Sequence, residues 1–167
     1  MKKANKIVSI AFVILVAITV IMYFYPQQNP RIDDIIIIRG AVSNPENLTV
    51  SQIEAFSPVT VQVMLMNRPD PSENGAFNYT GVTLKALLDQ AQIFTNATSV
   101  FIQAPDGYAV TLSMQDAEKS TTILAWQKDG SPMTPLSTGG EGPIRLVMGD
   151  QSFPHDWVKG VSLIVVK

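Results

Sequence analysis

Prolines and glycines divide the chain beyond residue 30 into short apolar runs, and this division constrains the fold more than any other feature. The sequence holds 11 prolines and 10 glycines among 167 residues. The apolar runs between them, such as Ile35–Arg39 and Val59–Met66, are too short for long helices but suit β-strands. Proline and glycine favour turns and interrupt helices. The pattern therefore predicts one β-rich α+β domain with a few short helices, rather than a helix bundle.

Strands are expected where β-branched residues cluster or alternate with polar ones. Val59–Met66 alternates most clearly, which predicts a strand with one buried face, and we interpret Met64 and Met66 as packing residues of that strand. The expected strands are Ile35–Arg39, Val59–Met66, Ser99–Gln103, Tyr108–Leu112, Thr121–Gln127, Ile144–Met148 and Val161–Val166.

Two helix signals and two turn signals complete the expected scaffold. Thr83–Gln92 carries its leucines on one helical stripe, which predicts an amphipathic helix. Thr49 lies three residues before Gln52, a spacing typical of a capping box at the start of a short helix. The segment from Arg68 to Asn78 contains two prolines and an Asn-Gly pair and is expected to be a surface loop. Asp106-Gly107 predicts a type I′ turn.

The N-terminus predicts a membrane anchor. Ile7–Tyr25 is 19 residues without a charge, a length of about 28 Å as a helix, close to the thickness of the hydrocarbon core. Three lysines precede it, which favours a cytoplasmic N-terminus. A cleaved signal peptide is the alternative, but no small-x-small cleavage site follows. We therefore expect a cytoplasmic stub and single-pass anchor over residues 1–26, a linker over 27–34, and a domain over 35–167 outside the cytoplasm at the cell membrane.

Charge and residue usage exclude several classes of function. Residues 31–167 hold nine basic and 14 acidic side chains, a net charge of −5 without any run of lysine or arginine. Such a domain is not expected to bind nucleic acid, which requires clustered cations. One histidine and no cysteine exclude the usual zinc sites, and no catalytic residue or metal ligand is assigned. Glycosylation at the sequons of Asn47, Asn78 and Asn96 stays open.

Several motifs in fixed order resemble the cofactor domain of the sulfite oxidase family, the oxidoreductase molybdopterin-binding domain. The resemblance extends from about Ile35 to Val166 and implies a β-rich α+β fold with mixed sheets and a few short helices. It also implies an oxidoreductase that depends on molybdopterin. The segments that carry it are Tyr79–Leu88, Gln103–Tyr108, Ile123–Trp126, Lys128–Gly130, Gly139–Val147 and Trp157–Val161.

The resemblance also identifies what this chain lacks. In the family's enzymes a cysteine thiolate binds molybdenum, and by order along the chain its place corresponds to Met64–Arg68. This sequence has no cysteine, and the neutral thioether of methionine is only a weak ligand. The enzymes also have a lysine before the tryptophan near the end of the domain. Here Asp156 precedes Trp157, so an anion replaces a cation that would face the pterin phosphate.

Seven residues are candidates to line a ligand pocket if the family's pocket persists. For Arg145 a structural salt bridge is favoured over contact with an anion. The candidates are Asn67, Arg68, Tyr108, Arg145, His155, Trp157 and Lys159.

Three functions remain open at this point. We favour a non-catalytic domain that binds a small anionic ligand or a membrane-protein partner, with no cofactor expected. The alternatives are an active molybdenum-cofactor oxidoreductase, or a protein that binds molybdopterin without redox chemistry. Since a fold does not carry a function with it, the site has to decide between them.

Overall fold

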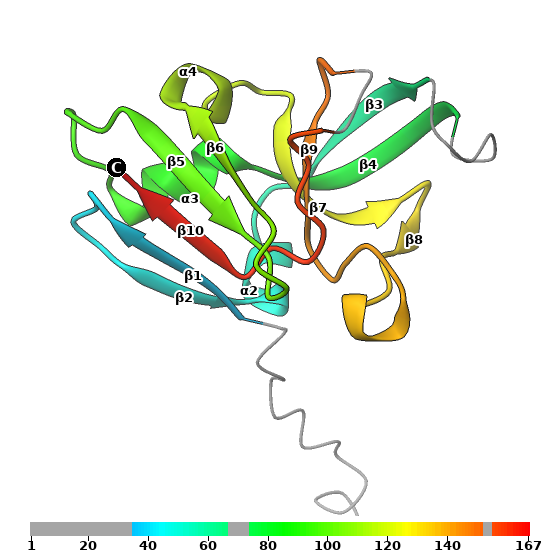
Figure 1. The fold of residues 1–167 in the computed structure, drawn as a ribbon, viewed down its shortest axis with the longest axis horizontal. Helices are drawn as coiled ribbons and strands as arrows, with labels where there is room; N and C mark the ends of the chain where they lie inside the picture. The colour runs from blue at the N-terminus through cyan, green and yellow to red at the C-terminus, as the bar shows by residue number, and fades with distance from the viewer. Residues whose placement is uncertain (1–34, 67–73, 152–154) are drawn as a thin grey trace, which may run out of the picture.

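Two β-sheets dominate the computed structural model, which describes residues 35–66, 74–151 and 155–167 (Figure 1). The first sheet has the strand order β2-β1-β10-β5-β6. Strand β1 pairs with β10 in parallel and the other neighbours are antiparallel, so the sheet is mixed. Its strands are β1 (Ile35–Gly40), β2 (Glu46–Thr49), β5 (Ser99–Gln103), β6 (Ala109–Ser113) and β10 (Leu163–Val166).

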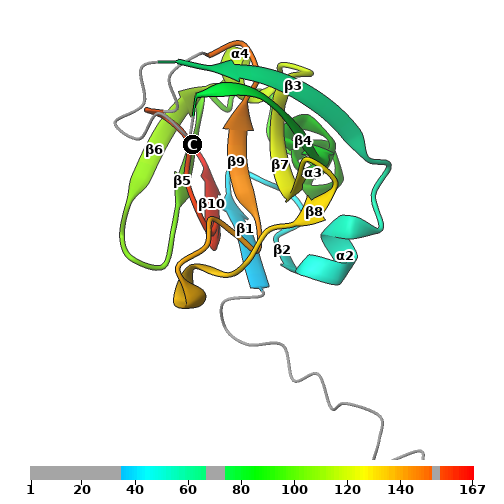
Figure 2. The same ribbon diagram turned by 90° about the vertical axis from the view of Figure 1, so that its right-hand side faces the viewer.

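The second sheet curves beside the first and is antiparallel throughout the described residues (Figure 2). It runs β3-β4-β7-β8, and β9 also pairs with β7. Central strand β7 is buried along most of its length because neighbours cover both faces. The strands are β3 (Val59–Leu65), β4 (Gly75–Thr83), β7 (Thr122–Lys128), β8 (Ser131–Pro132) and β9 (Arg145–Met148).

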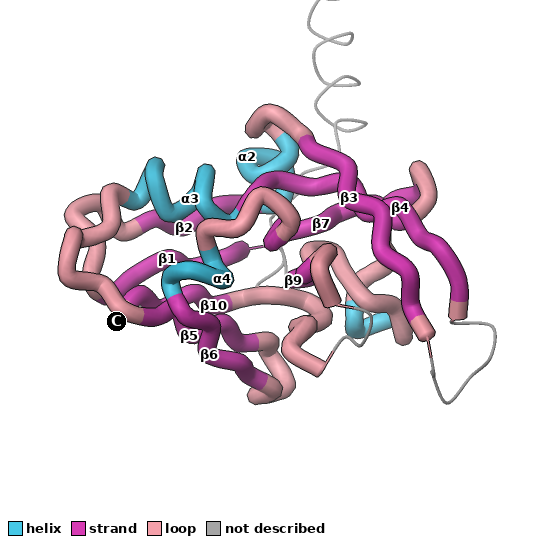
Figure 3. The backbone as a smooth tube through the Cα atoms, turned by 90° about the horizontal axis from the view of Figure 1, so that it is seen from above, coloured by secondary structure: helices cyan, strands magenta, loops and turns pink. Residues whose placement is uncertain are grey.

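Short helices cover the ends and one side of the sheets (Figure 3). The capping box expected at Thr49 is present, since its side chain accepts from the Gln52 backbone N–H and the Gln52 side chain bonds back. The helix over residues 84–91 buries the four apolar residues of its stripe in the core, as that stripe predicts. The helices are α2 (Val50–Glu54), α3 (Leu84–Ala91), α4 (Met114–Ala117) and the 3₁₀ turn η3 (Leu136–Thr138).

The structure corrects three local expectations. The loop expected over residues 68–78 ends earlier, because β4 begins at Gly75 and pairs along the whole of β3. Met64 and Met66 are 53% and 49% exposed, because the alternation of β3 turns them away from the core. Asp106 keeps an ordinary φ and only Gly107 is left-handed, at +91°, so the hairpin after β5 has no type I′ turn.

The type I′ geometry occurs instead at the next hairpin, where Asp129 and Gly130 both have positive φ, at 50° and 77°. Asp129 accepts the left-handed conformation because its short side chain bonds the Asn78 backbone N–H.

The predicted anchor, residues 7–25, and the linker lie outside the described residues. Within the part of the chain that the structure describes, no helix is long and apolar enough to cross a membrane.

Candidate functional site

Arg145 is the centre of the site, since a buried cation requires an explanation. It begins β9 and is only 3% exposed. Its backbone forms a bridge with Lys159, and the next residue, Leu146, donates its N–H to the Val158 carbonyl over 2.8 Å. These contacts bring the segment that follows His155 alongside β9.

Two aromatic rings enclose the Arg145 guanidinium. Its central carbon lies 4.9 Å from the ring centroid of Trp157 and 5.8 Å from that of Tyr79, on β4. The two rings meet edge to face, with centroids 5.5 Å apart. Trp157 is 3% exposed and Tyr79 is fully buried. Cation–π attraction is strongest where water is excluded, so this packing fixes the guanidinium in one place.

Glu141 neutralises the buried cation. One carboxylate oxygen accepts from Arg145 Nη1, and the other lies 3.2 Å from Lys159 Nζ. Burial alone raises the pKa of the Glu141 carboxyl, but the charges of Arg145, Lys159 and Lys128 outweigh it and hold the pKa below its usual range. The salt bridge expected for Arg145 is therefore present, and Glu141 is its partner.

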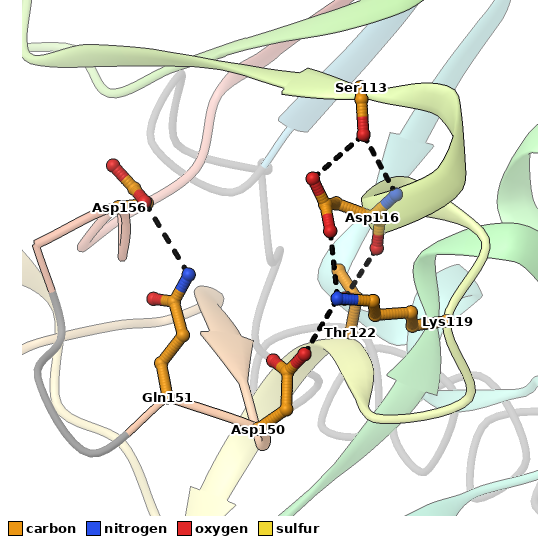
Figure 4. Close-up of polar contacts among 7 residues, drawn as sticks. All are labelled: Ser113, Asp116, Lys119, Thr122, Asp150, Gln151 and Asp156. Atoms are coloured by element: carbon orange, nitrogen blue, oxygen red, sulfur yellow. Dashed lines mark hydrogen bonds and ion pairs between the residues drawn. The ribbon is translucent and has the colours of Figure 1, made fainter.

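A second polar network fixes the chain where β9 ends (Figure 4). Lys119 Nζ lies 2.8 Å from Asp116 and 2.7 Å from Asp150 and so ties the residues after β9 to α4. These carboxylates raise the pKa of Lys119, and the hydrogen bonds from Lys119 and Ser113 lower that of Asp116. The network therefore ties Asp150, which follows β9, to the residues of α4 and the turn after it.

Asp156, which precedes Trp157, is exposed. The Gln151 side-chain amide donates to it over 3.4 Å, as Figure 4 shows. Asp156 therefore has a partner within the chain and remains accessible to solvent.

Five of the seven candidate residues lie together around the segment 155–159. Tyr108 is 47% exposed and donates its hydroxyl hydrogen to the carbonyl of His155. Trp157 and Lys159 meet Arg145 directly or through Glu141. Asn67 and Arg68 lie outside the described residues. The grouping follows from topology, because the β5–β6 hairpin and β9 both flank this segment.

The sequence patterns did not single out Tyr79 or Glu141 as partners of Arg145, or Lys128 as a further cation that acts on Glu141. Glu141 stands four residues before Arg145 in a glycine-rich turn, and this spacing was the one available signal. Tyr79 comes from β4, which is far from Arg145 in sequence and reaches it only because β4 pairs with β7 and β7 pairs with β9.

Comparisons with known proteins agree with this architecture. The crystal structure of the sulfane dehydrogenase SoxCD from Paracoccus pantotrophus is similar, with a TM-score of 0.64 and 18% identity. The match covers 81% of this chain and 39% of that chain, so this chain spans well under half of its length. Comparison with curated protein sequences gave no match.

A sequence model of one protein family matches this chain. The model described as "Oxidoreductase molybdopterin binding domain" matches residues 32–167, which is most of the sequence. The mixed first sheet, the antiparallel second sheet and the short helices fit the sulfite-oxidase-type fold that the structural match indicates. The chain belongs to the oxidoreductase molybdopterin-binding domain family.

Proposed function

We propose that this protein is a non-catalytic member of its family, which binds a ligand or a protein partner outside the cytoplasm and carries no molybdenum. The observation that carries the proposal is the absence of cysteine from all 167 residues. Oxidised molybdenum is a highly charged centre, and an anionic sulfur ligand neutralises part of that charge. Neutral thioether sulfur cannot do so.

The donor set around the family's metal position does not fit the cofactor. Met64 and Met66, near the end of β3, are about half exposed and have no anionic group to offer. Among the described residues, no three histidine, cysteine, aspartate or glutamate side chains come together as a metal site. No step of molybdenum chemistry is therefore assigned to this chain.

The cations that a pterin phosphate would need already form ion pairs within the chain. Glu141 binds both Arg145 and Lys159, and Trp157 is buried against Tyr79. A site filled by its own side chains favours a partner that contacts the surface over a large cofactor held inside. Tyr108 and His155 lie exposed beside this filled site and are our candidates for such contacts.

The location of the domain at the membrane, outside the cytoplasm, is also part of the proposal. It rests on the uncharged stretch Ile7–Tyr25 with lysines before it. A domain held beside the membrane by a short linker suits a neighbouring membrane protein as partner, because tethering raises the effective concentration of each for the other.

The test is cofactor analysis of the full-length chain, purified from a host that makes the molybdenum cofactor. A cysteine-bearing enzyme of the family, produced in parallel, shows that the host loads its products. We expect neither molybdenum nor pterin fluorescence above background. Pterin without metal would instead support a molybdopterin-binding protein without redox chemistry, and both together would support an active oxidoreductase and refute the proposal.

A further inference from the structure

One face of the first sheet, its outer face, is uncovered. Helices α2 and α3 lie on the core side of this sheet, and no described helix or strand covers the other side (Figure 1, Figure 3). Ile36 and Ile38 are buried in the core, so the alternation of β1 places Ile35, Ile37 and Arg39 on the outer face. Strand pairing extends this face in two rows. One row holds Asn47, Ile37, Leu163, Gln103 and Ala109, and the other holds Arg39, Val165, Phe101 and Thr111.

The centre of the outer face is apolar, although sheet faces that are open to water normally carry polar side chains. Ile37 is 41% exposed, and Leu163, Val165 and Phe101 are half-buried beside it. A cavity of about 460 Å³ lies against this centre, with walls from β1, β5, β10 and the turn after β5. Arg39 is the one charged side chain among the described residues that line it. An apolar surface of this kind marks a contact site.

The charges of the outer face are positive, in a domain that is acidic overall. Among the described residues, its charged side chains are Arg39 and Lys167, which follows β10. Arg39 forms no ion pair within the described part of the chain. Lys167 Nζ lies 4.9 Å from the ring centroid of Phe101, a contact that leaves its charge in place. Asp106, in the turn after β5, lines a different cavity. The outer face therefore favours an anionic partner.

The chain enters the domain at this same face. Ile35 begins β1 and lines the cavity. The expected membrane span ends at Tyr25, ten residues earlier. A chain of that length reaches about 35 Å at most, and about 17 Å on average if it is flexible. Its own charges, Arg31 against Asp33 and Asp34, sum to −1, so any attraction to anionic lipid has to come from the outer face. The tether keeps that face close to the bilayer and raises its effective concentration there.

We propose that the outer face of the first sheet docks on the anionic lipid surface of the membrane that holds the anchor. Ile37 and Phe101 enter the boundary between headgroups and acyl chains, and Arg39 and Lys167 contact lipid phosphates. Docking rests on the membrane location in the proposed function and adds an orientation to it. The second sheet, which holds Arg145 and its partners, is not part of the docked face.

A single fluorescent label tests the docking, because the chain has no cysteine of its own. Thr111 is exposed on the outer face, and Thr60 is exposed on β3 of the second sheet. The full-length Thr111→Cys and Thr60→Cys chains are labelled with a polarity-sensitive fluorophore and inserted into vesicles of phosphatidylcholine and phosphatidylglycerol. We expect nitroxide-bearing headgroups to quench the label at position 111 several-fold more than the label at position 60. Acrylamide in the water should show the reverse order.

Substitutions on the outer face should release the label at position 111 into water. Ile37→Gln should lower the ratio of docked to undocked label about fivefold or more, because an exposed apolar side chain is lost. Met64→Gln is the matched control, since Met64 is 53% exposed but lies on β3, and it should leave the ratio unchanged. Arg39→Gln should lower the ratio about fivefold on the anionic vesicles and leave it unchanged on pure phosphatidylcholine. Urea midpoints of the three variants check that the fold is kept.

Equal quenching at positions 111 and 60 would overturn the inference, and so would an Ile37→Gln chain that docks like the wild type. A label at position 111 that is shielded from acrylamide but not quenched by the nitroxide lipid would also overturn it, because a second copy or the linker then covers the face. Flotation with the vesicles separates this result from the proposed function. A chain that does not float refutes the membrane location, whereas a chain that floats with its label in water refutes the docking alone.

Discussion

The pair of Arg145 and Glu141 predicts unequal losses of stability when either partner is removed. Arg145 is 3% exposed, whereas the side chain of Glu141 is 26% exposed and has Lys159 as a second partner. Glu141→Ala leaves a buried guanidinium without its counter-ion, which costs about 3 kcal/mol or more. Arg145→Met leaves a carboxylate that water and Lys159 still reach, and fills the space with an apolar chain. We expect a loss of about 1–2 kcal/mol, largely from the lost cation–π contact.

Urea unfolding of the purified chain, followed by tryptophan fluorescence, measures both losses. The double variant should lose less than the sum of the single variants, with a coupling of about 1 kcal/mol or more. Asp89→Ala, which removes the exposed ion pair between Lys85 and Asp89, serves as the control. Its urea midpoint should equal that of the wild type, because solvent screens this ion pair. Equal losses for the two single variants, or a greater loss for Arg145→Met, would refute the argument that burial sets the cost.

Three further outcomes are expected. Gly81→Ala places a Cβ 2.2 Å from the Leu124 carbonyl oxygen, and this clash should lower the stability by about 3 kcal/mol. Gly107→Ala has open space around it but a φ of +91°, so it should lower the stability by only about 1 kcal/mol. Urea midpoints of the two variants that fall in the opposite order would contradict this. Thr49→Ala removes the capping box of α2 and should lower the stability by about 1 kcal/mol, and hydrogen exchange should show faster opening of α2 alone. Because the pKa of Glu141 is lowered on folding, its contribution is complete above the ordinary value of 4.5 and fades as pH falls through the folded value. The stabilities of wild type and Glu141→Gln should therefore converge in acid, and a constant difference would contradict the assignment.

Local patterns predicted much of the fold, because they depend on neighbouring residues. The alternation of β3, the leucine stripe of α3 and the capping box at Thr49 each follow from the physics of a single element. The start of β4 at Gly75 could not be predicted in this way. The glycine, asparagine and prolines nearby favour a loop, and only the pairing of β4 with β3 overrides that preference.

The site was only partly predictable for the same reason. Arg145, Trp157 and Lys159 stand within one short stretch, and their family motif made them candidates. The partners that define the chemistry of Arg145 come from elsewhere. Tyr79 reaches it across β7, and Glu141 does so through a turn whose path depends on packing. The identity of a counter-ion is a property of the assembled sheets, which no single segment specifies.

The molybdenum-to-protein ratio tests the central claim most directly. The full-length chain, produced in cells that assemble the cofactor and purified without chelators, is measured by mass spectrometry of the metal against amino-acid analysis of the protein. A chain with no thiolate should show a ratio no higher than that of an unrelated exported domain from the same cells. One molybdenum atom bound per chain would contradict the account.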